Sequence, residues 1–136
     1  MLVQHAIEGK AAEFGKPNPL ETYLRITLGQ NNGDSHGIPY VMEIWPVGHY
    51  SPVHNHGGAD AVIRVLHGTI QVSLCPFLSQ SGVDPFAVQQ FAKEDITWLS
   101  ATLNQVHMLK NLDTNTSTCI TIQCYKYDSS DTAHYD

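Results

Sequence analysis

The chain has little charge and no long apolar run, and both shortages exclude classes of protein. Charged residues make up 15% of its 136 residues, and 7 Lys and Arg against 13 Asp and Glu give a net charge of −6. Because nucleic acids and anionic membranes attract basic proteins, we expect neither as a partner. No apolar run approaches the roughly 18–20 residues that cross a bilayer. The opening residues also lack the basic start and apolar core of a secretory signal.

Cysteine is equally scarce, and its count suggests a compartment. Cys75, Cys119 and Cys124 are the only cysteines, and they form no C-x-x-C pair. An odd number without that spacing predicts neither a disulfide framework nor a cysteine-rich zinc site. We therefore expect a cytoplasmic protein in which the three thiols are small buried apolar side chains.

The pattern along the chain predicts an all-β fold, a sandwich or a small barrel. After residue 22, short β-rich runs alternate with turn residues, and no segment shows a helical period of 3.6. His67-Gly68 separates two such runs and predicts a hairpin. We divide the chain into a lead-in at 1–22 with a helical turn at 8–14, a β domain at 23–128 and a polar tail at 129–136. The predicted strands are 23–28, 39–45, 61–66, 69–74, 87–92, 95–99, one around residue 107, and 117–127.

Histidine is the residue that is plentiful, with 8 copies. His54 and His56 are different from the others, because residues i and i+2 of an extended segment project to the same side and can meet one ion. His107 is a third candidate on another predicted strand, and His49 is the next candidate if His107 is not a ligand. The remaining four are expected to be solvated in the lead-in, a turn-rich loop, a turn and the tail: His5, His36, His67 and His134.

G-x5-H-x-H ends at His56 with Gly68 further on, and H-x3-N begins at His107. These two short motifs resemble those of the cupin superfamily. The run from Ser51 to His56, SPVHNH, more narrowly resembles the cysteine dioxygenase type of thiol dioxygenase. So do Trp45 and Gly48 before it, the Tyr23-Leu24-Arg25 triplet, and Tyr125 on the last predicted strand. The resemblance covers about residues 20–128 and implies a cupin barrel, the double-stranded β-helix also known as a jelly roll.

By this resemblance, His54, His56 and His107 hold a mononuclear non-haem Fe(II), with nickel or zinc as other occupants. Three imidazoles leave coordination sites open for a thiolate and O2. The implied reaction is oxidation of a small thiol to its sulfinate, with cysteine as the first candidate substrate and 3-mercaptopropionate or cysteamine as others. By analogy with the family, a homodimer is a further possibility.

Four further residues are candidates for the substrate side of the site. Arg25 would bind a substrate carboxylate with its planar guanidinium, and a surface ion pair is an equal alternative. Tyr23 and Tyr125 would place hydroxyl groups near the substrate, or are core aromatics. Gln123 shares an inward strand face with Tyr125 and could hydrogen-bond its hydroxyl. Arg64, in contrast, is expected to be solvated.

The sequence departs from the family pattern at two positions, and Gln123 is the one that weakens the implied chemistry. Ala61 stands where the first cupin motif has glutamate and animal cysteine dioxygenases have a cross-linking cysteine, so it offers neither a ligand nor a thioether. Ala61 alone does not argue against catalysis, because bacterial family members with a small residue there are active without the cross-link. Gln123 stands where the family has histidine, and an amide cannot exchange protons near neutral pH. The alternative function is therefore a metal-binding cupin with a binding or regulatory role and no thiol oxidation. A cupin isomerase or hydrolase is a weaker third hypothesis.

Overall fold

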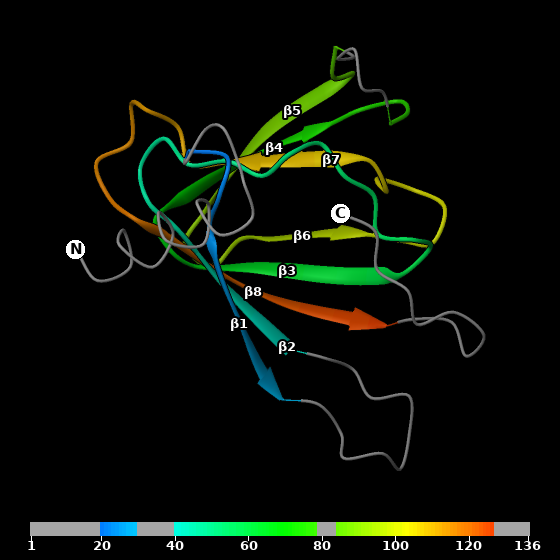
Figure 1. Cartoon of the computed structure of the whole chain (residues 1–136), viewed down its shortest axis with the longest axis horizontal. Helices are drawn as coiled ribbons and strands as arrows, with labels where there is room; N and C mark the ends of the chain where they lie inside the picture. The colour runs from blue at the N-terminus through cyan, green and yellow to red at the C-terminus, as the bar shows by residue number, and fades with distance from the viewer. Residues whose placement is uncertain (1–19, 30–39, 79–83, 127–136) are drawn as a thin grey trace.

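The computed structural model describes residues 20–29, 40–78 and 84–126 (Figure 1). All regular structure in these residues is β-strand, which confirms the all-β prediction. No helix in the described ranges has the length and apolar character needed to cross a membrane. The eight strands are β1 Leu24–Gly29, β2 Tyr40–Trp45, β3 Asp60–His67, β4 Thr69–Leu74, β5 Ala87–Ala92, β6 Ile96–Leu99, β7 His107–Lys110 and β8 Cys119–Lys126.

The strands form two antiparallel sheets that lie as separate layers (Figure 1). One sheet has five strands in the order β1-β2-β8-β3-β6, and the other has three in the order β5-β4-β7. Strand β8 therefore lies between β2 and β3, although it is the last strand in the chain. This order places the first and the last strand of the chain in one sheet, with β2 between them.

The hairpin predicted at Gly68 is wrong, because β3 and β4 belong to different sheets. A single residue between two strands is too short for a two-residue hairpin turn. Instead, the β3–β8 register shifts between Val65 and His67, and Gly68 adopts a φ of 73°. The chain thus leaves the first sheet at His67 and enters the second at Thr69.

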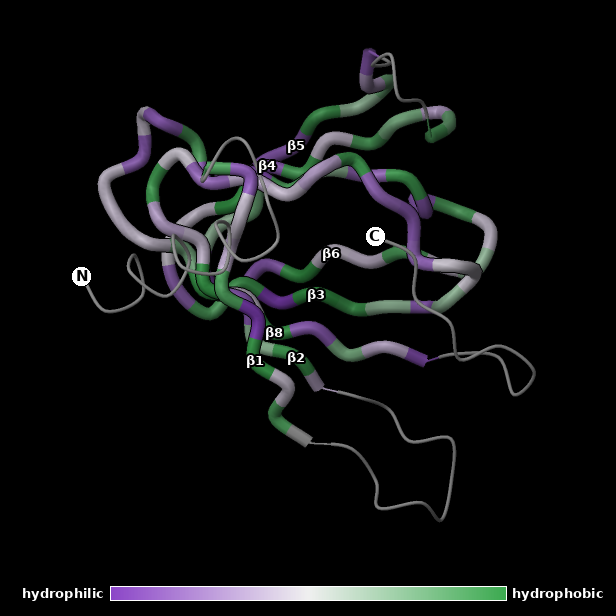
Figure 2. The backbone as a smooth tube through the Cα atoms, in the orientation of Figure 1, coloured by the Kyte–Doolittle hydropathy of each residue, from purple (hydrophilic) through white to green (hydrophobic). Residues whose placement is uncertain are grey.

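The core lies between the sheets, and strands such as β2 point alternate residues inward. Val41, Glu43 and Trp45 of β2 are buried, whereas Met42 and Ile44, which alternate with them, are half-buried. Hydrophobic and hydrophilic residues accordingly mix along both sheets (Figure 2). One buried cluster consists of Trp45, Val65, Ile70, Val72, Leu109 and Cys119, and a second of Val41, Ala61, Leu99 and Tyr125.

The cysteine prediction is confirmed for two of the three residues. All three thiols are free, and Cys75 and Cys119 are buried. Cys124 is only half-buried, because it lies on the outward side of β8, out of phase with the buried Gln123 and Tyr125.

Several predictions fall on residues outside the described ranges. The helical turn at 8–14 and the tail at 129–136 are among them, so the proposed three-part division stays a prediction.

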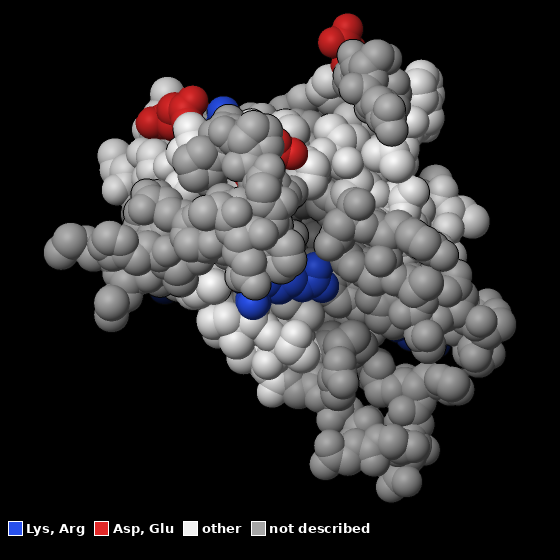
Figure 3. All heavy atoms as spheres, viewed as in Figure 1, with Lys and Arg blue, Asp and Glu red and all other residues white. Residues whose placement is uncertain are grey.

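Charged groups are few on the face shown in Figure 3, where most of the described surface is uncharged. Arg64 is exposed as expected and forms an ion pair with Glu94.

Candidate metal centre

Three histidine side chains converge on one point inside the barrel. His54 and His56 come from the segment between β2 and β3, and His107 is the first residue of β7. The Nε2–Nε2 distances are 3.1 Å from His54 to His56, 2.8 Å from His56 to His107, and 3.2 Å from His107 to His54. All three residues are buried. The ring planes meet at 72–80°, so the three nitrogens face one another rather than the rings stacking.

The backbone aligns two of these side chains. His54 and His107 form an isolated antiparallel bridge, in which each N–H donates to the carbonyl of the other at 3.0 Å. Just before it, Ser51 donates its N–H to the Leu109 carbonyl at 2.9 Å and accepts from the Leu109 N–H through Oγ at 3.0 Å. The segment around residues 50–54 is thereby held against β7.

The tautomer of His54 follows from its second nitrogen. His54 Nδ1 lies 2.8 Å from the Pro52 carbonyl oxygen, which can only accept a hydrogen bond. The proton of the neutral ring is therefore on Nδ1, and Nε2 offers a lone pair to the centre. Such hydrogen bonds from the far ring nitrogen orient metal-bound histidines in general.

Burial also keeps His107 in its neutral form. Desolvation first, and then the electrostatic interaction with His54, lowers the pKa of His107 to about 3. The side chain consequently remains an unprotonated imidazole through the physiological pH range, which is the form that binds metals.

The nitrogen triangle fits a metal ion. With metal–nitrogen bonds of about 2.1 Å, nitrogens at right angles are about 3.0 Å apart, and tetrahedral ones about 3.4 Å. The observed 2.8–3.2 Å match three ligands on one face of an octahedron. Among the described residues this is the one group of three that could hold a metal. A facial triad leaves the opposite positions open to ligands.

Tyr125 lies beside this centre, and Arg25 lies against Tyr125. The Tyr125 ring centroid is 5.4 Å from that of His56, and Tyr125 is 1% exposed. The Arg25 Cζ lies 5.6 Å from the Tyr125 centroid, which is the arrangement of a cation–π contact. The structure thus brings together two of the four residues that were candidates for the substrate side.

Gln123 joins Tyr125 to a buried carboxylate. The Tyr125 hydroxyl donates to Gln123 Oε1, and Gln123 Nε2 donates to Glu43 Oε2. The predicted hydrogen bond between Gln123 and Tyr125 is therefore present. On the same face of β8, Thr121 Oγ1 accepts from Trp45 Nε1 at 3.2 Å.

Tyr23 and His49 are not part of the nitrogen triangle. The Tyr23 ring stacks on Trp45 with centroids 4.0 Å apart and packs against the first core cluster, which favours the core-aromatic alternative for the ring. His49 is buried outside the triangle, with Nδ1 2.7 Å from the Thr22 carbonyl oxygen. His67 is exposed, as expected. The remaining histidines lie outside the described residues: His5, His36 and His134.

Sequence reasoning missed Glu43. It is 2% exposed and is the one acidic residue among the buried residues of the described chain. In the β1–β2 register it lies directly opposite Arg25, on the inward face. A signal was available, because a glutamate stands in phase with Val41 and Trp45 on a strand whose apolar residues point inward.

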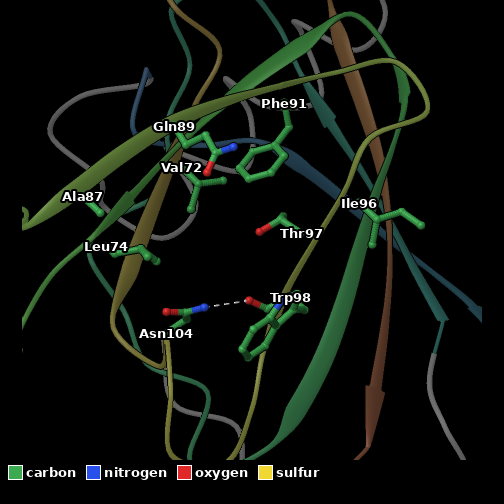
Figure 4. A pocket seen from close by; sticks show the side chains of 9 residues that line it. All are labelled: Val72, Leu74, Ala87, Gln89, Phe91, Ile96, Thr97, Trp98 and Asn104. Atoms are coloured by element: carbon green, nitrogen blue, oxygen red, sulfur yellow. Dashed lines mark hydrogen bonds between the residues drawn. The ribbon is translucent and has the colours of Figure 1, made fainter.

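A separate cavity of about 210 Å³ lies between the sheets near β5 and β6 (Figure 4). Asn104 and Trp98 line it, and Asn104 donates through Nδ2 to the Trp98 carbonyl at 3.2 Å (Figure 4). None of the three histidines lines it. Its remaining lining residues are Val72, Leu74, Ala87, Gln89, Phe91, Ile96 and Thr97.

Comparison with known proteins places the architecture. No protein-family model matches the chain. The cupin domain of Schizosaccharomyces pombe Cnp3 is similar at a TM-score of 0.59 and 12% identity, over 80% of this chain and 62% of that one. An uncharacterised Klebsiella pneumoniae protein with a double-stranded β-helix domain gives a TM-score of 0.61 and 15% identity, over 84% of both chains. An Acinetobacter L-ribose isomerase gives 0.58 and 14%, over 79% of this chain and 59% of that one. The chain therefore spans less than two thirds of two of these structures, and it has the cupin fold, the double-stranded β-helix.

Proposed function

We propose that this chain is an Fe(II)-dependent thiol dioxygenase acting in the cytoplasm on a small thiol. The observation that supports it most is the ligand set: three imidazoles converge on one centre, with Tyr125 beside His56 and Arg25 against Tyr125. The resemblance of the SPVHNH run to cysteine dioxygenases agrees with this arrangement.

The reaction adds both atoms of O2 to the sulfur of a thiolate and yields a sulfinate. Sulfur loses the electrons that O2 gains, so no other reductant is needed. Fe(II) held by His54, His56 and His107 would lower the pKa of a bound thiol and supply the redox chemistry. Because the three imidazoles are neutral, they leave the charge of the ion uncompensated, which favours an anionic thiolate.

The protein side chains orient and shield the reacting groups. The Pro52 carbonyl holds the ring of His54 with Nε2 toward the centre. The Tyr125 ring lies beside that of His56, and its hydroxyl is held by Gln123. Burial of the triad keeps bulk water away from these groups.

Oxygen uptake after anaerobic reconstitution with Fe(II) tests the proposal. We expect uptake with at least one of cysteine, 3-mercaptopropionate and cysteamine, and a product heavier than the thiol by two oxygen atoms. His107→Ala should abolish uptake, and the matched control His67→Ala should not, because His67 is exposed. Uptake no faster than in the metal-free protein for all three thiols contradicts the proposal.

A metal-binding module without turnover is the second candidate, and Gln123 favours it. An amide next to Tyr125 can hold the hydroxyl, but it cannot exchange protons near neutral pH. An iron-loaded protein that binds a thiol spectroscopically, and consumes no O2, would support this role.

A sugar isomerase is a third candidate, favoured by the buried carboxylate of Glu43 together with the L-ribose isomerases among the structural neighbours. Proton transfer between carbons requires a base, and Glu43 is the buried acidic group of the described chain. Formation of a ketose from L-ribose by the Mn(II)-loaded protein would support this candidate.

A further inference from the structure

The Glu43 side chain is buried, where an unpaired charge would destabilise the fold. It is 2% exposed and lies on the inward face of β2 between Val41 and Trp45, which are also buried. A buried carboxylate destabilises a fold unless it is hydrogen-bonded and opposed by a positive charge. Both conditions are met on this sheet, by Gln123 through a hydrogen bond and by Arg25 directly across the strand pair.

The carboxylate determines which way the Gln123 amide faces. A carboxylate can only accept, so it selects the NH2 group of Gln123 and turns Oε1 toward Tyr125. The Tyr125 hydroxyl then donates its single proton to that oxygen. The hydroxyl has no second proton to donate. Toward a ligand at the centre it can therefore only accept a hydrogen bond through its oxygen lone pairs.

Glu43 also changes what Arg25 offers to a ligand. Residues directly opposite in an antiparallel pair have Cβ atoms about 4.5–5.5 Å apart, close enough for opposite charges to offset each other. Arg25 and Glu43 stand in that relationship. A ligand carboxylate would gain less from Arg25 and would meet the negative charge of Glu43, whereas an ammonium group would gain from Glu43.

We infer that Glu43 is a positioning residue that sets the substrate class of the site, favouring small thiols that carry a protonated amino group over thiols that carry only a carboxylate. The inference rests on the proposed function and narrows its substrate. Cysteamine and 3-mercaptopropionate separate the two classes, because both have a thiol on a two-carbon chain and they differ in the charged end group.

Anaerobic thiol binding to the Co(II)-loaded protein, followed by the thiolate-to-metal charge-transfer band, gives dissociation constants without turnover. The wild-type protein should bind cysteamine at least about tenfold more tightly than 3-mercaptopropionate, with neutral 2-mercaptoethanol between them. Glu43→Gln should lower the ratio of the two affinities by about tenfold or more. A general loss of packing would weaken both ligands and leave the ratio unchanged.

Glu94→Gln is the matched control, because Glu94 is an exposed glutamate paired with Arg64. It should leave the ratio as in the wild type. If the wild type binds 3-mercaptopropionate as tightly as cysteamine, or shows no thiolate band with either, the inference is wrong, and this holds even if Glu43→Gln does not fold. An unchanged ratio in a folded Glu43→Gln variant also overturns it.

The two proposals fail separately. A shifted ratio without O2 uptake by the iron-loaded protein supports the role of Glu43 and contradicts the dioxygenase. O2 uptake with an unshifted ratio supports the dioxygenase and contradicts the role of Glu43.

Discussion

His54 and His107 are 53 residues apart in the chain and are joined by two backbone hydrogen bonds of 3.0 Å. Their Nε2 atoms lie 3.2 Å apart as a result of this bridge. The third nitrogen, from His56, needs no bridge of its own because it follows His54 by two residues. Backbone pairing therefore contributes to the convergence of the three nitrogens.

Removal of any one of these histidines should abolish metal retention. His54→Ala, His56→Ala and His107→Ala each leave two imidazoles, and we expect a loss of at least ~100-fold in affinity, more than loss of an outer hydrogen bond causes. Metal content after purification without chelator measures it, and His67→Ala serves as the control. If His107→Ala binds metal as well as the wild type, the triangle is misassigned.

Much of the strand pattern could be predicted from the sequence, because alternation with a period of two is a local property. The buried series Val41, Glu43 and Trp45 is an example, since it occupies alternate positions of β2. The i, i+2 spacing of His54 and His56 likewise predicted a shared side. Local spacing could not show that His107 meets them, because that contact depends on which strands pair across the barrel.

The partners of a strand were the least predictable feature. His67-Gly68 has the composition of a tight turn, yet β3 and β4 pair with other strands and with different sheets. The role of Glu43 was hidden for the same reason. Its neighbours Arg25 and Gln123 lie on β1 and β8, on either side of β2, and only the sheet order brings the three together.

Gly68 and Gly58 form a matched pair for testing how the chain crosses from β3 in one sheet to β4 in the other. Both have positive φ, 73° and 82°, but a Cβ on Gly68 would lie 2.7 Å from the Thr118 carbonyl oxygen, whereas a Cβ on Gly58 meets nothing within 4 Å. Gly58→Ala should cost about 1–2 kcal/mol of folding free energy from backbone strain alone. Gly68→Ala should cost about 3 kcal/mol or more, because backbone must also shift. Denaturant unfolding measures both, and equal costs would contradict the close approach at Gly68.

Cys119 should make the stability fall at alkaline pH. Burial raises the pKa of its thiol from 9.0 to about 12, so between these values the folded protein keeps a proton that the unfolded chain releases. Folding stability is therefore complete below about pH 9 and declines as the pH rises toward 12, by about 2 kcal/mol at pH 10.5 from this group. Cys119→Ala should flatten the slope of unfolding free energy against pH. An identical slope in the two proteins would show that the thiol ionises normally in the fold.

Asn111 follows β7 and hydrogen-bonds the end of β2, where the segment that carries His54 and His56 begins. We expect that a carboxylate cannot replace its amide. Its Nδ2 donates to the carbonyls of Trp45 at 2.8 Å and Ser117 at 3.0 Å, and the residue is fully buried. Asn111→Asp keeps the shape but turns an oxygen, and a buried charge, toward those two acceptors. We expect a loss of roughly 3–5 kcal/mol in unfolding free energy, as for an unpaired buried charge, and weaker metal retention in any folded fraction. Asn104→Asp is the graded control, since Asn104 is half-buried and its Nδ2 donates to one carbonyl, that of Trp98, at 3.2 Å. Chemical unfolding of the two variants should separate them by at least about 2 kcal/mol, and similar losses would show that the two carbonyl contacts of Asn111 contribute little.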